Sequence, residues 1–217
     1  MNSQAPTERQ WLLTSIISGV GASVTYLVSI LVPLPSLQAS YLLFMLFGPC
    51  FCCTMCSLYQ YHRVRHETVP LQLGIMLLVL AGAINTVMAA MQGALRIYFE
   101  NLPHEPEVVS EATRTAWKMG MHSGNSLQMG VDVAWDYFVL TGMILLGIAL
   151  AGHEMFGRWF GWSAIALGAA GMVFNGWTFP DPPGSAGLLD VGPLCAGWFT
   201  ILVIRMIMIF RSKGGLE

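Results

Sequence analysis

The longest uncharged stretch of this chain runs from Gln10 to Tyr61 and contains no Asp, Glu, Lys, Arg or His. It is rich in Leu, Val, Ile, Met and Phe, and further apolar segments follow it, separated by short charged loops. A soluble domain of 217 residues cannot bury that much uncharged sequence, whereas a lipid bilayer accepts it. The composition agrees, because 55% of the residues are hydrophobic and only 10% are charged. The chain is therefore predicted to be an integral membrane protein.

The apolar segments divide into about six predicted transmembrane helices, because a helix needs roughly 20 residues to cross a bilayer. Their expected bounds are Trp11–Val32, Leu37–Tyr59, Leu71–Ile97, Val131–Gly152, Trp159–Thr178 and Val191–Phe210. We expect an all-α fold, a polytopic bundle that forms one transmembrane domain over residues 1–217. An even number of crossings places both termini on the same side of the membrane.

The distribution of charge orients this bundle, since Lys and Arg near short loops tend to stay in the cytoplasm. Seven basic residues fall at the termini and in the second and fourth loops, and three fall on the other side. The first group is Arg9, Arg63, Arg65, Arg158, Arg205, Arg211 and Lys213, and the second is Arg96, Arg114 and Lys118. We therefore predict an N-in, C-in topology, with the cell (plasma) membrane as the expected location.

Two segments outside the predicted spans stand out, and both fall on the extracytoplasmic side. The first, at about 98–130, holds two prolines and several acids, and its part from Val108 to Lys118 alternates apolar and polar residues at helical spacing. It is expected to form a short outer helix that leads into the fourth span. The second, at about 178–190, is a loop stiffened by three prolines.

Small residues recur on several predicted spans, including Gly19 and Gly21, Gly82, and Gly168 and Gly171. Lipid provides no hydrophobic force that drives helices together, so close backbone approach through small residues is a usual way for spans to associate. These glycines are predicted to lie at helix contacts.

Polar side chains form a stripe along the segment that enters the fourth span. His122, Asn125, Met129, Asp132 and Asp136 recur at intervals of three and four, which places them on one helical face. A carboxyl group at the centre of a bilayer costs about 2.5–3.5 kcal/mol, so such a group is retained when it is partnered or functional.

Other polar residues are expected to converge on the same level of the bundle. Asn85, Gln92 and Arg96 share a stripe on the third span, and Asn175 and Asp190 lie at the outer ends of the last two spans. We predict an outward-facing polar cavity walled by spans three to six, which binds a small polar or amphipathic ligand or an ion for transport or sensing. The predicted ligand-binding residues are Asn85, Gln92, Arg96, Asp132, Asp136, Asn175 and Asp190.

Three alternatives remain open for these residues. In the first, Arg96 forms an ion pair with Asp132 or Asp136 that only holds helices together. In the second, His122 and the two acids bind a divalent metal and activate water, as an intramembrane hydrolase requires. In the third, the chain is an accessory subunit that packs against a larger protein partner or against copies of itself. No catalytic residue is assigned.

Soft-metal handling is a further possibility for the cysteines of the second span. Cys52, Cys53 and Cys56 can share helical faces, and thiolate and thioether ligands select Cu(I). Membrane-embedded Cys and Met more often behave as apolar filler, so no cofactor is assigned. The sequence has no glycine-rich phosphate loop and no basic run, so neither a nucleotide nor nucleic acid is expected as a partner.

Overall fold

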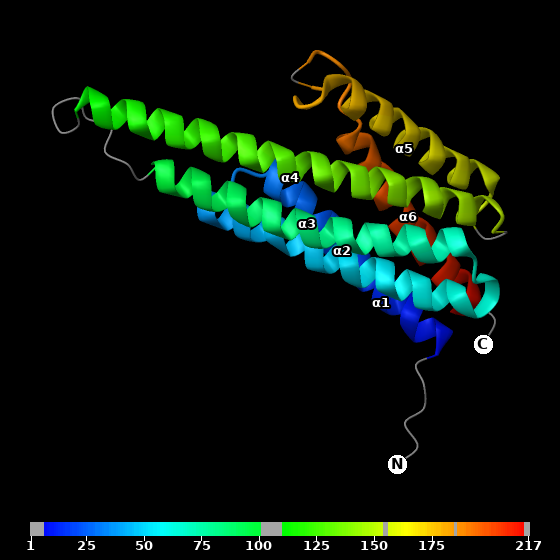
Figure 1. Ribbon diagram of the computed structural model, residues 1–217. Helices are drawn as coiled ribbons and strands as arrows, with labels where there is room; N and C mark the ends of the chain where they lie inside the picture. Colours follow the sequence, from blue (N-terminus) through cyan, green and yellow to red (C-terminus); the bar gives the residue numbers. More distant parts are fainter. Residues whose placement is uncertain (1–6, 101–109, 154–155, 185, 215–217) are drawn as a thin grey trace.

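The computed structural model describes residues 7–100, 110–153, 156–184 and 186–214, and this part of the chain folds into six helices without a strand. The helices are α1 Glu8–Leu31, α2 Leu37–His66, α3 Val69–Glu100, α4 Glu111–Ala151, α5 Arg158–Thr178 and α6 Gly192–Gly214. They form a bundle, and the chain alternates direction from one helix to the next (Figure 1). The predicted all-α helical bundle is confirmed.

Polar side chains mark where several helices begin. Thr7 and the N3 residue Gln10 form a capping box at the start of α1, in which the Thr7 side chain accepts from the Gln10 N–H. Ser36 accepts a hydrogen bond from the N–H of Ala39 at the start of α2. Ser110 does the same for Thr113 at the start of α4. Each cap satisfies a backbone donor that has no partner inside its own helix.

Five of the helices, all except α5, are long and apolar enough to cross a membrane. The predicted count was about six, and the difference lies in α5, whose composition is dominated by Gly, Ala and Trp rather than by Leu, Ile and Val. This helix still turns the chain back along the second half of α4 (Figure 1). The first turn of α1 and the last turn of α6 consequently lie at the same end, which we call the terminal end (Figure 1).

Glycines make the closest helix contacts. A Cβ atom added at Gly82 would lie 3.0 Å from the carbonyl oxygen of Gly48, and one at Gly74 would lie 2.8 Å from the backbone nitrogen of Leu146. The predicted contact glycine Gly168 meets the carbonyl oxygen of Leu140 in the same way, at 2.7 Å. Backbones approach this closely only where no side chain intervenes, as expected for helices that associate in lipid.

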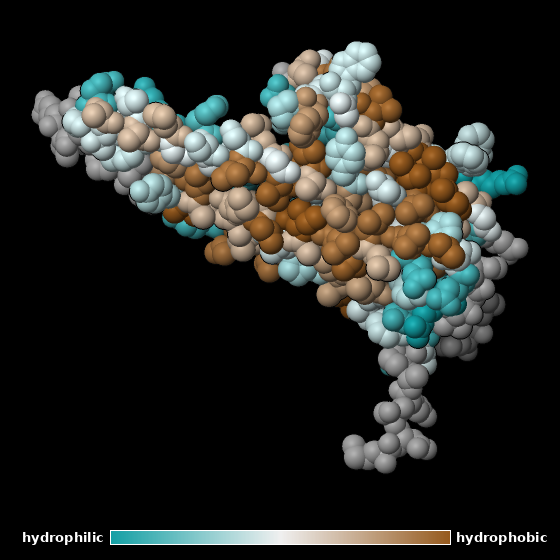
Figure 2. All heavy atoms as spheres, in the orientation of Figure 1, coloured by the Kyte–Doolittle hydropathy of each residue, from teal (hydrophilic) through white to brown (hydrophobic). Residues whose placement is uncertain are grey.

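The outer surface of the bundle is apolar. Figure 2 shows brown side chains across the middle of one face, with teal side chains gathered toward the ends. Large hydrophobic side chains such as Ile17, Leu42 and Val173 are exposed by 64%, 62% and 61%. A water-soluble protein rarely leaves such a surface uncovered, whereas a bilayer covers it. The chain is a multi-pass membrane protein.

The α4 helix differs from the expected arrangement. The short outer helix predicted at Val108–Lys118 is not separate, because the chain is helical without a break from Glu111 to Ala151. Gly130, which stood at the expected boundary, is an ordinary helical residue in open space. At 1.5 Å per residue α4 is about 61 Å long, roughly twice the hydrocarbon thickness. Its first turns extend past the ends of α1 and α2 (Figure 1).

Candidate functional site

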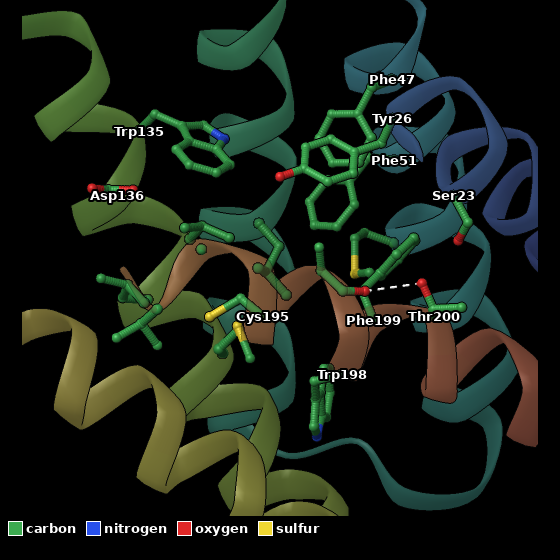
Figure 3. Close-up of a pocket in the computed structure, with 18 of the residues that line it drawn as sticks. Ser23, Tyr26, Phe47, Phe51, Trp135, Asp136, Cys195, Trp198, Phe199 and Thr200 are labelled. Atoms are coloured by element: carbon green, nitrogen blue, oxygen red, sulfur yellow. Dashed lines mark hydrogen bonds between the residues drawn. The ribbon is translucent and has the colours of Figure 1, made fainter. Parts of the chain in front are cut away.

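A cavity lies between the helices in the middle of the bundle (Figure 3). The volume open to the centres of water-sized molecules is about 70 Å³. All six helices and the end of the α5–α6 loop contribute to its wall. The lining residues used below are Ser23, Tyr26, Phe47, Phe51, Met55, Leu78, Trp135, Asp136, Met143, Leu146, Asn175, Asp190, Cys195, Ala196 and Phe199.

One end of the cavity is acidic. Asp136 of α4 interacts electrostatically with Asp132, one turn away on the same helix, and with Asp190, which precedes α6. Asp190 also interacts with the Tyr26 hydroxyl group of α1, and both Asp136 and Asp190 interact with the Cys195 thiol of α6. Three parts of the chain that are distant in sequence, α1, α4 and the start of α6, therefore bring their polar groups to one place. We call Asp132, Asp136 and Asp190 the carboxyl cluster.

Asn175 connects α5 to this cluster. Its side chain is 7% exposed, and its amide nitrogen Nδ2 donates to the carbonyl oxygen of Gly171, 3.0 Å away. The amide also interacts with the Asp136 carboxyl group. The glycines of α5 bring Asn175 close, because Gly168 and Gly171 let this helix approach α4 at Leu140, one turn beyond Asp136.

Asp190 is held by the start of α6. Its Oδ1 atom accepts a hydrogen bond from the backbone N–H of Gly192 at 2.9 Å. This contact fixes one carboxyl oxygen at the helix N-terminus, where the backbone dipole favours negative charge. The Asp190 side chain is thereby positioned at the wall of the cavity.

The other end of the cavity is apolar and rich in aromatic rings. Phe51 stacks on Phe47 with ring centroids 5.4 Å apart and contacts Phe199 at 5.1 Å. Met55, Leu78, Met143 and Leu146 complete this end, and each is at most 3% exposed. The Tyr26 ring, 5.4 Å from that of Phe47, lies where the apolar and acidic ends meet.

Asn85 of α3 is buried at about the same level as Asp136. Contacts of Gly74 with Leu146 and of Leu95 with Gly124 set the antiparallel register of α3 and α4, which places Asn85 opposite Trp135 and Asp136. Asn85 lies two turns from Leu78 and therefore on the same face of α3, the face that reaches the cavity. Its side chain is 1% exposed, and its Oδ1 atom has no hydrogen-bond partner within the described ranges.

The other predicted residues of α3 lie apart from the cavity. Gln92 is half-buried and Arg96 is exposed, and neither lines the cavity wall. Arg96 lies about 16 Å beyond Asn85 along the helix axis. The structure therefore brings Asp136, Asn175 and Asp190 to one cavity, with Asp132 and Asn85 beside it, and leaves Gln92 and Arg96 near the outer end of α3.

His122 also lies far from the carboxyl cluster. It is exposed on the outer part of α4, about 15 Å from Asp132 and about 21 Å from Asp136 along the axis. One metal ion cannot bind side chains so far apart, so these positions give the metal-site hypothesis no support. Within the described ranges, no group of three His, Cys, Asp or Glu side chains is arranged to hold a metal.

Several cavity residues were missed at the sequence level because they lie on α1 and α2. The predicted wall comprised spans three to six, whereas Tyr26, Phe47 and Phe51 come from the first two helices. Ser23 and Tyr26 are three residues apart and share a helical face, which is the only local signal that the sequence offered.

A search of known proteins found no matching family, no similar curated protein and no similar solved structure.

Proposed function

We propose that this membrane protein binds a small amphipathic molecule in the central cavity, for transport or sensing. One observation carries the proposal: the cavity has a carboxyl cluster at one end and Phe, Met and Leu side chains at the other. A few polar groups converging on an otherwise apolar pocket are typical of small-molecule sites. A ligand with one polar and one apolar part would satisfy both ends.

The cost of the carboxyl groups supports a binding role over a purely structural one. Asp136 lies on a helix that is apolar enough to cross the membrane, and Arg96, the basic partner expected for a structural ion pair, is not in the cavity wall. Ionisable side chains within spans are rare and usually mark ligand or ion pathways. We propose the plasma membrane as the location and the extracytoplasmic side as the side of the acidic end, on the distribution of Lys and Arg.

The test asks whether the protein binds a small probe saturably, and whether filling the cavity abolishes that binding. The probes are 2-phenylethylamine, 2-phenylethanol and 3-phenylpropanoate, which share an aromatic body and differ in charge. Equilibrium dialysis of each radiolabelled probe against protein-loaded and empty lipid nanodiscs separates binding from partition into lipid. At least one probe is expected to bind saturably.

The variant Ala196→Phe places a ring in the cavity wall and is expected to abolish this binding. Ala166→Phe makes the same change at an exposed position on α5 and is the matched control. Thermal unfolding of both variants shows that they fold. The absence of saturable binding for all three probes, or equal binding by Ala196→Phe and the wild type, would refute the proposed function.

A further inference from the structure

The geometry points to a particular class of ligand: we infer that the cavity selects an organic ammonium ion, a protonated amine with a short apolar or aromatic body. This inference rests on the proposed function and adds the sign of the charge and the place of the charged group. The ammonium group lies at the carboxyl cluster, and the body of the ligand lies against Phe51, Met143 and Leu146.

The charge of the cavity wall has one sign. Asp136 and Asp190 line the cavity, Asp132 interacts with both, and no Lys, Arg or His is among the lining residues of the described chain. Asp132 and Asp136 are half-buried, and Asp190 is exposed. Carboxylates that interact in this way repel one another, and a cation beside them reduces that repulsion. An anionic ligand would add to it. The wall therefore favours a cation over a neutral or anionic molecule of the same size.

A buried polar atom supplies a second and independent indication. Asn85 Oδ1 is inaccessible to solvent and has no hydrogen-bond partner within the described ranges. Asn85 lies on the cavity-facing side of α3 at the level of Asp136. A buried acceptor without a partner costs about 1–3 kcal/mol. An ammonium group has three donors, so it can serve a carboxylate and this acceptor together.

Aromatic rings border the position of the charge. Figure 3 shows Trp135 and Asp136 on neighbouring positions of α4, with the Tyr26 hydroxyl group pointing toward the same region. The faces of Trp and Tyr rings attract ammonium groups, by about 0.5–2 kcal/mol. Aromatic rings next to carboxylates are therefore suited to an organic cation.

A bare inorganic cation fits this wall less well. Beyond Tyr26 the wall consists mainly of Phe, Met and Leu side chains, and the hydroxyl groups of Ser23 and Thr200 are the side-chain oxygens among its described residues. Hard cations need six or more oxygen ligands at short distance. An ion held by the carboxyl cluster would leave the apolar end filled with water, whereas the body of an amine would occupy it.

The test compares 2-phenylethylamine, 2-phenylethanol and 3-phenylpropanoate in the dialysis assay. We expect the amine to bind about tenfold or more tightly than the alcohol, and the acid to bind most weakly. Asp136→Asn should reduce amine binding by about tenfold and change alcohol binding by less than about twofold. Asp181→Asn, at an exposed aspartate of the α5–α6 loop, is the matched control and should leave all three affinities unchanged.

Asn85→Leu provides a second variant, which keeps the number of side-chain heavy atoms and removes the buried acceptor that has no partner. Thermal unfolding shows that this variant folds. It should weaken amine binding and spare alcohol binding. Equal affinities for the amine and the alcohol, or tighter binding of the acid, would overturn the ammonium assignment and leave the proposed function standing. Binding of none of the three probes would overturn both.

Discussion

The Ser15 hydroxyl group of α1 donates a hydrogen bond to the backbone carbonyl oxygen of Thr54 on α2, 3.1 Å away, and it also contacts the Met206 sulfur of α6 at 3.3 Å. Ser15 is completely buried, so one small polar side chain joins three helices. Thr54 adds a second contact, because its hydroxyl group donates to the Ser18 oxygen at 3.0 Å.

We predict that Ser15→Ala lowers the free energy of unfolding by about 0.6 kcal/mol and by no more than about 1.7 kcal/mol, the average and the maximum for interhelical hydrogen bonds in membranes. Denaturant titration in detergent measures this loss. Ser126→Ala is the control, since the Ser126 side chain is exposed and bonds only to the His122 carbonyl oxygen of its own helix. Equal losses in the two variants would mean that the contact among α1, α2 and α6 does not stabilise the bundle.

A second prediction concerns the α4–α5 contact. A Cβ atom at Gly147 would lie 2.7 Å from the carbonyl oxygen of Gly161 and 3.0 Å from the Ala164 side chain. Backbone cannot move aside as a flexible side chain does, so Gly147→Ala is expected to destabilise the protein by about 1–3 kcal/mol. The midpoint of thermal unfolding in detergent should fall accordingly.

Gly130→Ala is the control for this change on the same helix, because a Cβ atom there meets nothing within 4 Å. Alanine is the better helix former by about 0.8–1.0 kcal/mol, so this variant should be neutral or more stable. A Gly147→Ala protein as stable as Gly130→Ala would show that α5 does not pack on α4 at this point.

Two histidines give a third prediction. His62 and His153 are buried at the terminal end of the bundle, with ring centroids 4.6 Å apart, and Phe156 packs against both. His62→Ala should therefore cost roughly 2–4 kcal/mol, as large-to-small changes in packed interiors do. The same substitution at exposed His122 should change stability by less than about 0.5 kcal/mol. Chemical unfolding measures the loss of stability in both variants. Similar losses in His62→Ala and His122→Ala would contradict a packing role for His62.

A fourth prediction uses Cys195 as a reporter of the field inside the cavity. In a variant with Ala at Cys50, Cys52, Cys53 and Cys56, this thiol should react with the cationic reagent aminoethyl methanethiosulfonate faster than with the anionic sulfonatoethyl reagent. Each rate is first divided by the rate of the same reagent with free cysteine. The ratio of the cationic to the anionic rate is then expected to be about ten or more, because Asp136 and Asp190 interact with the thiol. Mass spectrometry follows the labelling.

Asp136→Asn should lower this ratio. The control is a variant that lacks all native cysteines and carries Ser126→Cys, at an exposed position on the outer part of α4. Its ratio of cationic to anionic labelling rates should be near one. A faster reaction of Cys195 with the anionic reagent would contradict the acidic character of the cavity.

The sequence predicted the helices well because bilayer thickness limits the length of apolar segments. The predicted bounds Leu37–Tyr59 and Trp159–Thr178 lie within or close to α2 Leu37–His66 and α5 Arg158–Thr178. The expected short outer helix and the fourth span are one helix, because a glycine costs a helix only about 1 kcal/mol and α4 continues through Gly130. Composition alone does not distinguish a linker from a helix that leaves the membrane.

The site was only partly predictable. A helical stripe fixes which residues share a face, and it correctly grouped Asp132 with Asp136. It does not fix which neighbouring helix that face meets, nor the register between two helices. The contribution of Tyr26 on α1 and the exposure of Arg96 depend on these quantities, which follow from side-chain packing across distant segments. The binding role of the cavity remains a prediction for the experiments above.

The continuity of α4 has a mechanical consequence. The turns that extend past α1 and α2 and the turn that carries Asp136 belong to one rod, without a proline to serve as a joint. The outer turns are therefore coupled to the carboxyl cluster through continuous helical backbone, in which the Ser123–Gly124 pair is the place where a helix of this composition bends most readily.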